Sequence, residues 1–180
     1  MTKPTIKFKR PIGRQPVIVQ ILPALVRGGV ERGTVEMAKA IQNAGGHAVV
    51  ISNGGPLVRH IERCGGKHIA LPVHVKNPLR WPGLRRQLRT IFQTEGADVV
   101  HVRSRVPAWL ALSVAKSMGI ATISTVHSRF TSRSFLKRRY NAKLLDAGQV
   151  IAISNYVHGL ITSQYIGVED RLTVVHRGVD

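Results

Sequence analysis

A small set of glycine, histidine, arginine and serine residues lies directly after short apolar runs of the sequence. Imidazole gains or loses a proton near neutral pH, and arginine and serine side chains bind anions and hydroxyl groups. Such residues mark a ligand site where parallel strands end, because ligands of open α/β sheets bind beyond the carboxyl ends of the strands. The residues in these positions are Gly28, Gly29, His101, Arg103, Ser104, His127, Ser128, Arg129 and Ser154.

The glycine pair follows the β-branched run at 17–22 and precedes a helical pattern that begins near Val30. A helix start at a glycine turn directs backbone N–H groups and the positive end of the helix dipole at a bound anion. The alternative interpretation is a tight connection without a ligand. A dinucleotide site is disfavoured because the spacing is not G-x-G-x-x-G and the second run ends in Ser52-Asn53, and no G-K-[S/T] follows to make a P-loop.

His127 is the candidate for a catalytic group because it comes directly after the run at 121–126. The alternative is a packed or solvated histidine with no chemical role. We predict no metal site, because His101 and His127 have no cysteine or carboxylate close to them in the sequence. No nucleophile elbow and no carboxylate pair is visible. Asp98, at the start of a predicted strand, is the one acidic residue expected near the level of the cleft.

Alternating apolar runs and amphipathic segments must position these residues. The pattern predicts an α/β domain with an open parallel sheet of about seven strands and helices on both faces. Val30, Met37, Ala38 and Ile41 are expected to form the core stripe of the first helix, and Leu136, Tyr140 and Leu144 that of a basic helix. The strands are predicted at 17–22, 47–52, 67–71, 98–102, 121–126, 149–153 and 171–175, and the helices at 30–43, from 56, from 82, and at 107–118, 135–145 and 154–164.

The chain is strongly basic, with 27 Lys and Arg against 9 Asp and Glu and a formal net charge of +18 over 180 residues. This excess favours an acidic partner such as a nucleic acid, an anionic membrane or a phosphorylated substrate. Cys64 is the single cysteine, which excludes an internal disulfide. A basic start followed by an apolar run at 17–26 resembles a secretory leader. Gln20 and Pro23 interrupt that run, so we predict a cytoplasmic protein.

Part of the positive charge is concentrated in one segment near the end of the predicted fifth strand. A solvated helix face is one interpretation, and contact with anionic lipid headgroups is another. Nucleic-acid binding is the least favoured, because aromatic residues are few and are not interleaved with the basic ones. The predicted membrane or anion contacts are Arg133, Lys137, Arg138, Arg139 and Lys143, with Arg129 just before them.

Five segments, in this order, resemble motifs of family-4 glycosyltransferases, which have the GT-B fold. They are Leu-Pro-x-x-x-x-Gly-Gly-Val-Glu-Arg-Gly-Thr at 22–34, Asp-Val-Val-His-Val-Arg-Ser-Arg-x-Pro-Ala-Trp at 98–109, Thr-Val-His-Ser at 125–128, Val-Ile-Ala-Ile-Ser-Asn-Tyr-Val at 150–157, and Val-Val-His-Arg-Gly-Val-Asp at 174–180. The resemblance covers nearly the whole chain from Pro16 onward.

The resemblance implies a retaining transferase that moves a sugar from a nucleotide-diphosphate donor to a cell-envelope glycan or glycolipid without a metal or other cofactor. It implies two Rossmann-like domains, of which this chain matches the N-terminal, acceptor-binding one. His127 would face the transferred sugar, and Gly28, Gly29 and Ser154 would lie on the donor side. The expected acceptor-binding residues are His101, Arg103, Ser104, Ser128 and Arg129.

The expected organisation is a flexible basic arm at 1–16, a Rossmann-like domain at 17–175, and the start of an interdomain crossing at 176–180. The family's second domain, with its basic residues on the donor phosphates and its E-x7-E glutamates, has no match in the sequence. We therefore expect weak or no transfer by the chain alone, which needs that domain or a partner chain. The expected location is cytoplasmic or peripheral on the inner face of the cytoplasmic membrane. A non-catalytic binding module and a nucleic-acid binder are the alternatives.

Overall fold

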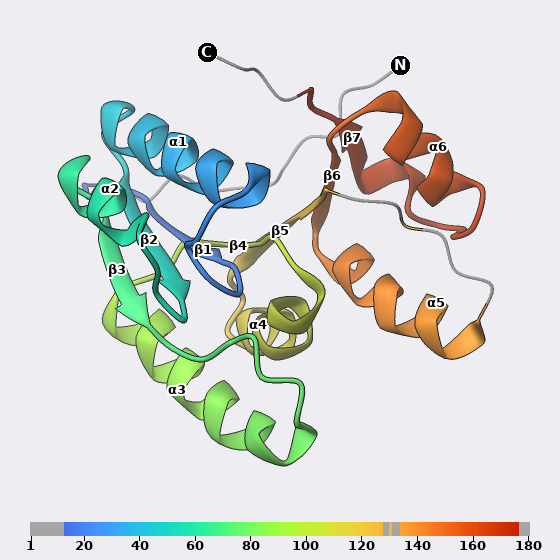
Figure 1. Cartoon of the computed structure of the whole chain (residues 1–180), viewed down its shortest axis with the longest axis horizontal. Helices are drawn as coiled ribbons and strands as arrows, with labels where there is room; N and C mark the ends of the chain where they lie inside the picture. Colours follow the sequence, from blue (N-terminus) through green and yellow to red (C-terminus); the bar gives the residue numbers. More distant parts are fainter. Residues whose placement is uncertain (1–12, 128–129, 131–133, 177–180) are drawn as a thin grey trace.

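The computed structural model describes residues 13–127, 130 and 134–176 of the chain. Seven parallel strands form one sheet in the order β3-β2-β1-β4-β5-β6-β7 (Figure 1). The strands are β1 (Val17–Ile21), β2 (His47–Ser52), β3 (Lys67–Ala70), β4 (Val99–Val102), β5 (Ala121–Val126), β6 (Gln149–Ala152) and β7 (Leu172–Val174). The α-helices are α1 (Gly29–Asn43), α2 (Val58–Arg63), α3 (Trp81–Thr94), α4 (Arg105–Ser117), α5 (Phe135–Ala142) and α6 (Asn155–Thr162), with short 3-10 turns at Pro78–Arg80, Lys143–Asp146 and Glu169–Arg171.

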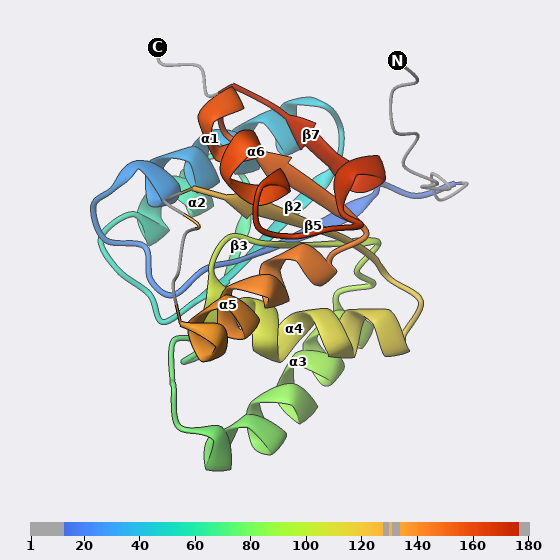
Figure 2. The same cartoon turned by 90° about the vertical axis from the view of Figure 1, so that its right-hand side faces the viewer.

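The helices divide between the two faces of the sheet, so the predicted fold class is confirmed. Residues of α1 and α2 pack in one apolar cluster with Ala48 and Val50 of β2 and with Leu22 and Leu25, which follow β1. Residues of α3, α4 and α6 pack in a second, larger cluster on the other face. Figure 2 shows α3, α4 and α5 below the sheet and α1 above it. This arrangement follows from the right-handed crossover of each β-α-β unit, because the strand order reverses direction at β1.

Coverage of the α1 face is uneven. On β5, Thr122, Ser124 and Val126 point toward α4 and are buried, whereas Ile123 on the α1 side is only half-buried. Ile151 of β6 and its register partner Thr173 of β7 are also half-buried. In the part of the chain that the structure describes, α1 and α2 are the helices on this face, and they lie over the β1–β3 half of the sheet. The α1 side of β5–β7 therefore keeps a partly open surface.

The predicted burial of Met37 and Leu136 is wrong, and so is the predicted place of Asp98 near the cleft. Met37 is 40% exposed because it lies beside the partly open surface that α1 leaves uncovered, and Leu136 is 76% exposed on the first turn of α5. The helical period does not continue from Leu136 to the buried Leu144, because α5 gives way to a 3-10 turn at Lys143. Asp98 lies at the amino end of β4, away from the strand ends that hold the predicted site.

Asp98 joins the start of β4 to the segment before β1. It accepts hydrogen bonds from the guanidinium of Arg14, at 2.6 and 2.8 Å, and from the backbone N–H of Val17 at 2.8 Å. Residues 1–12 of the predicted arm and 177–180 of the predicted crossing lie outside the described residues. No helix within the described ranges is long and apolar enough to cross a bilayer.

Candidate substrate-binding site

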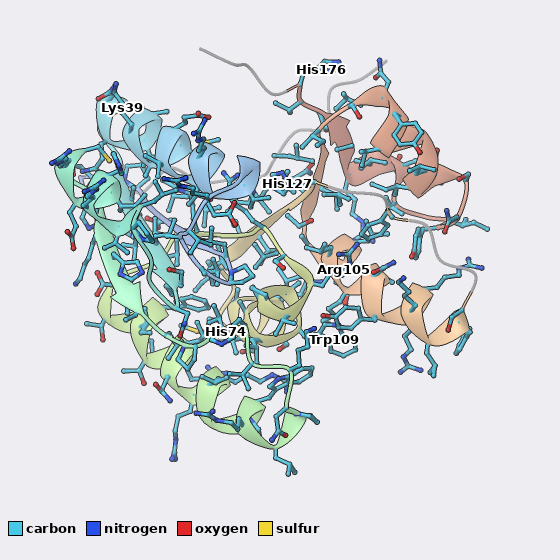
Figure 3. The ribbon with its side chains drawn as sticks, in the orientation of Figure 1. Lys39, His74, Arg105, Trp109, His127 and His176 are labelled. Carbon is cyan, nitrogen blue, oxygen red and sulfur yellow. The ribbon has the colours of Figure 1, made fainter. Side chains whose placement is uncertain are left out.

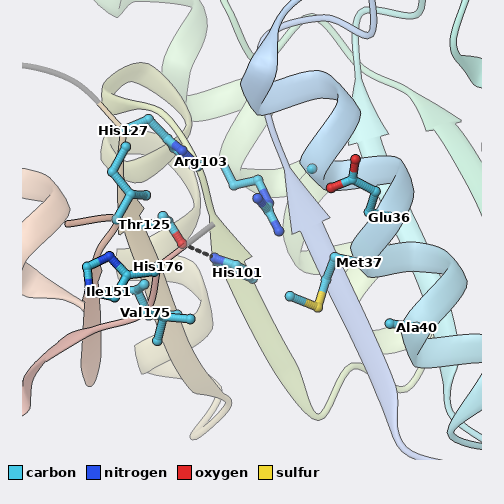
Figure 4. A pocket seen from close by; sticks show the side chains of 12 residues that line it. Glu36, Met37, Ala40, His101, Arg103, Thr125, His127, Ile151, Val175 and His176 are labelled. Carbon is cyan, nitrogen blue, oxygen red and sulfur yellow. Dashed lines mark hydrogen bonds between the residues drawn. The ribbon is translucent and has the colours of Figure 1, made fainter. Parts of the chain in front are cut away.

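Two hollows meet at the carboxyl ends of β4 and β5. The first, of about 270 Å³, lies between α1 and the half-covered side of β4–β6, and the second, of about 220 Å³, lies over the start of α4. Arg103, Thr125 and His127 line both of them. The first is also lined by Gly33, Glu36, Met37, Ala40, His101, Ile151, Ile153, Val175 and His176 (Figure 4).

The sheet register brings the polar side chains of neighbouring strands together. His101 of β4 is paired with Gln20 of β1 on one side and with Ile123 of β5 on the other. Side chains alternate between the two faces along a strand, so His101 and Thr125 both point to the α1 side. The His101 Nε2 and the Thr125 Oγ1 lie 2.7 Å apart in a hydrogen bond (Figure 4).

His101 is held as a neutral imidazole. The side chain is buried, and burial is the main reason that its pKa lies well below the ordinary value for histidine. The positive charges of Arg103 and His127 lower this pKa further. His101 can therefore exchange hydrogen bonds with Thr125 near neutral pH without adding charge to the hollow.

We expect this histidine to make the folded protein acid-sensitive. Above pH 6.5 His101 is neutral in both the folded and the unfolded chain. Below pH 6.5 His101 becomes protonated in the unfolded chain but stays neutral in the folded one. The free energy of unfolding therefore falls by about 1.4 kcal/mol per pH unit until the pH reaches the lowered pKa of His101 in the folded protein. Urea unfolding at several pH values should show a shallower acid loss for His101→Gln than for the wild type. Equal slopes would contradict the neutral assignment.

Arg103 is fixed by a buried polar chain that begins on α1. Its Nε donates to Oε1 of Gln20 at 3.1 Å, and Nε2 of Gln20 donates to the backbone oxygen of Thr34 at 3.2 Å. Arg103 is 7% exposed and Gln20 is fully buried. Sequence reasoning missed Gln20 and Thr125, although a polar residue inside a β-branched run was an available signal. It also missed Glu36, Arg105 and His176, which line the hollows.

The structure places the remaining predicted residues at different distances from the hollows. Ser104 lines the second hollow. Gly28 and Gly29 line neither hollow, although Val30 and Gly33 of the same helix do, so the glycine bend lies beside them. The carboxylate of Glu31 folds back over Gly28. Ser154 caps α6 by accepting from the N–H of Val157 at 3.2 Å. Ser128, Arg129 and Arg133 lie outside the described residues.

His127 and Arg103 are the two predicted site residues that line both hollows. In the view of Figure 3 His127 lies between α1 and the segment that ends at His176. Within residues 13–127, 130 and 134–176, no group of three or more His, Cys, Asp or Glu side chains lies close enough together to hold a metal ion. The hollows instead combine arginine and histidine side chains with an apolar wall, and this set suits a polar ligand that carries negative charge.

A seven-stranded parallel sheet with a polar site at its strand ends defines a Rossmann-like domain of the kind found in GT-B enzymes. The chain belongs to Glycosyltransferase Family 4, whose family model matches residues 27–180. It is 34% identical to a glycosyltransferase from Rickettsia africae ESF-5, with a TM-score of 0.80, over 92% of this chain and 44% of that one. The family resemblance found in the sequence is thereby confirmed.

Two more distant structures share the fold. HepE from Anabaena, crystallised with UDP-glucose, is 16% identical with a TM-score of 0.73, over 91% of this chain and 44% of that one. The lipopolysaccharide outer core galactosyltransferase WaaB is 14% identical with a TM-score of 0.67, over 92% and 46%. The chain thus spans less than half the length of each of these three proteins. No curated protein sequence gives a significant match.

Proposed function

We propose that the chain is the acceptor-binding half of a retaining glycosyltransferase that moves a sugar from a nucleotide-diphosphate donor to a cell-envelope glycan or glycolipid. The observation that supports this most strongly is the pair of hollows that share His127 and Arg103 at the strand ends. A donor bound in one hollow and an acceptor bound in the other would then both lie next to the imidazole of His127. Family membership supports glycosyl transfer, and the UDP-glucose complex of HepE supports a nucleotide-sugar donor.

Each side chain has a defined task under this proposal. His127 donates a hydrogen bond to the reacting sugar or its leaving oxygen, where negative charge develops during transfer. His101 and Thr125 hold the floor of the first hollow through their hydrogen bond. The glycine bend at Gly28-Gly29 lets the donor diphosphate approach the start of α1. A second domain supplies the other cationic groups on the diphosphate, so the chain alone is expected to transfer sugar weakly or not at all.

A fusion tests the proposal directly. Residues 1–180 joined to the C-terminal half of the Rickettsia africae enzyme rebuild a two-domain protein, and 34% identity favours a compatible interface. We expect the fusion to consume one sugar of a nucleotide-sugar panel, read as nucleotide release, and the separate chain to release far less. Retention of the sugar's anomeric configuration would be read by NMR. A soluble, folded fusion that consumes no donor, while the parent enzyme does, would count against the proposal and favour a binding module.

We further propose that α5 brings the enzyme to an anionic membrane surface. Phe135 and Leu136 are 74% and 76% exposed at its start, and Lys137 and Arg139 are exposed beside them. Exposed apolar residues next to basic ones are typical of helices that lie in the membrane interface. Arg138 and Lys143 have other contacts, because Arg138 donates to the backbone oxygen of Gln164 and Lys143 pairs with Asp146.

Both the basic and the apolar residues of α5 should contribute to vesicle binding. Lys137→Gln with Arg139→Gln is expected to weaken retention on phosphatidylglycerol vesicles at low salt by roughly thirtyfold, at about 1 kcal/mol per basic residue. Phe135→Ser with Leu136→Ser should also weaken it, and that loss should persist at higher salt. Arg86→Gln with Arg89→Gln on α3 removes the same charge elsewhere and serves as the control. Equal retention of all three pairs would contradict the assignment to α5.

A further inference from the structure

A further large apolar side chain is exposed on the side of the molecule where α5 begins. Leu79, in the 3-10 turn at Pro78–Arg80 before α3, is 87% exposed. Figure 2 shows the starts of α3 and α5 one below the other on one side of the molecule. Single exposed leucines are common on protein surfaces, whereas a group of exposed apolar residues marks an interaction site. Leu79, Phe135 and Leu136 form such a group, here called the α3–α5 corner.

A row of aromatic rings joins the turn to α5. The ring centroids of Trp81 and Trp109 lie 5.9 Å apart, and those of Trp109 and Tyr140 lie 6.4 Å apart. Trp81 is the first residue of α3, two residues after Leu79. Leu136 precedes Tyr140 by four residues on α5, so these two side chains lie on one helix face. The row therefore links Leu79 at one end of the corner to Leu136 at the other.

Hydrogen bonds hold the turn that presents Leu79. The side-chain oxygen of Asn77 accepts from the N–H of Leu79 at 3.0 Å, and the indole N–H of Trp81 donates to the backbone oxygen of Val75 at 2.9 Å. The N–H of Arg80 donates to the backbone oxygen of Asn77 at 3.2 Å. The exposed leucine is thus fixed in place before any partner binds, which lowers the entropy that binding must remove.

The charge of the α3–α5 corner suits an anionic partner. Residues 72–81 and 134–143 contain Lys and Arg but no Asp or Glu. Lys76 and Arg80 are exposed on the two sides of the turn. Apolar side chains next to basic ones fit a lipid interface, because the apolar groups enter the acyl boundary while the cations meet the anionic headgroups.

The aromatic rings of the corner are not open platforms for nucleic-acid bases. Trp109 lies between two other rings, and the ammonium of Lys143 lies 5.4 Å from its centroid. The guanidinium of Arg85 lies 5.8 Å from the centroid of Trp81. Proteins that bind single-stranded nucleic acids stack the bases on exposed ring faces. An anionic lipid surface therefore fits the corner better than RNA or DNA does.

We propose that the turn at Pro78–Arg80 is a second membrane contact, which inserts Leu79 into an anionic bilayer while the start of α5 inserts Phe135 and Leu136. This inference rests on the proposed membrane contact of α5 and adds a second anchor. Two anchors fix the tilt of the domain on the membrane, which a single helix would leave free. The turn follows β3 and α5 follows β5, so both segments leave the edge of the sheet that holds the hollows.

Retention of the 180-residue chain on phosphatidylglycerol vesicles tests the second anchor. Leu79→Ser is expected to weaken retention about tenfold, because a large aliphatic side chain is no longer removed from water. Lys76→Gln with Arg80→Gln should weaken retention at low salt and much less at high salt. Tyr156→Ser, which removes a side chain that is 61% exposed on α6, away from the corner in Figure 1, should leave retention unchanged.

Tryptophan fluorescence locates the contact, because Trp81 and Trp109 are the two tryptophans of the chain. Brominated lipids quench a tryptophan only when it comes close to the bilayer. In Trp109→Phe the remaining tryptophan directly follows the turn. We expect brominated phosphatidylglycerol vesicles to quench it strongly, and the quenching to fall when Leu79→Ser is added.

The outcomes separate this inference from the α5 contact on which it rests. If Phe135→Ser with Leu136→Ser weakens retention and Leu79→Ser does not, the second anchor is wrong and the α5 contact stands. If the unchanged chain is not retained at all, both are wrong. Unquenched Trp81 in vesicle-bound Trp109→Phe would also overturn the second anchor, as would tighter binding to single-stranded RNA than to vesicles. The fused two-domain enzyme should be retained like the separate chain, and loss of retention there would show that the second domain covers the corner.

Discussion

Alanine in place of Gly55 is expected to lower the free energy of unfolding by about 3 kcal/mol or more. Gly55 has a φ of +140°, and an added Cβ would lie 2.6 Å from the carbonyl carbon of Leu25 and 3.1 Å from the backbone nitrogen of Val26. Neither the loop after β1 nor the loop after β2 can move aside easily, because two backbone hydrogen bonds join them. The N–H of Leu25 donates to the oxygen of Gly54 at 2.8 Å, and the N–H of Leu57 donates to the oxygen of Leu25 at 3.0 Å.

Gly83 provides the matched control for this substitution. It lies in α3, and an added Cβ there meets nothing within 4 Å. Gly83→Ala is therefore expected to stabilise the protein by about 0.5–1 kcal/mol, the usual gain for this exchange inside a helix. Urea unfolding followed by circular dichroism measures both variants. A Gly55→Ala protein as stable as the wild type would show that the loops after β1 and β2 are not in the contact described.

The strands were the part of the fold that the sequence predicted best. Continuous β-branched runs mark strands covered on both faces, and β2 and β5 begin and end at the predicted residues. Helix starts were harder to place, because proline favours the first turn without defining it. The helix expected from Pro56 begins at Val58, and the one expected near Pro82 begins at Trp81 after a 3-10 turn.

Side-chain exposure was predictable only where the neighbours of an element could be inferred. Met37 and Leu136 carry the right periodicity for a core stripe, yet both are exposed, because periodicity does not say which part of a sheet a helix covers. Met37 overhangs the open α1 side of the sheet and lines the first hollow. Leu136 extends past the core on a helix of only 8 residues.

The candidate site was predictable as a set of strand ends but not as a set of contacts. Chain order and the strand-end rule brought His101, Arg103 and His127 together correctly around the first hollow. Register between β1, β4 and β5 depends on the whole sheet, so the bonds of Gln20 to Arg103 and of His101 to Thr125 could not be inferred from spacing. For the same reason the glycine bend was expected nearer to His127 than the structure places it.

Alanine at position 127 is expected to lower the turnover of the fused two-domain enzyme by about a hundredfold or more. His127 lines both hollows, so its imidazole can reach the atoms exchanged between donor and acceptor. Removing one preorganised donor from developing negative charge typically costs 10²–10³ in kcat, and a loss confined to kcat indicates an interaction made in the transition state. His127→Gln keeps an N–H donor and should recover part of the rate.

The control for this variant is His47→Ala, at the amino end of β2, because His47 lines neither hollow. Its turnover should equal that of the unchanged fusion. Urea unfolding of His127→Ala should remain close to that of the parent, since a loss of folded protein would lower the rate without any catalytic role. A well-folded His127→Ala fusion that keeps its kcat within about threefold would remove His127 from the reaction, because the effect of a lost donor would then fall far below the expected range.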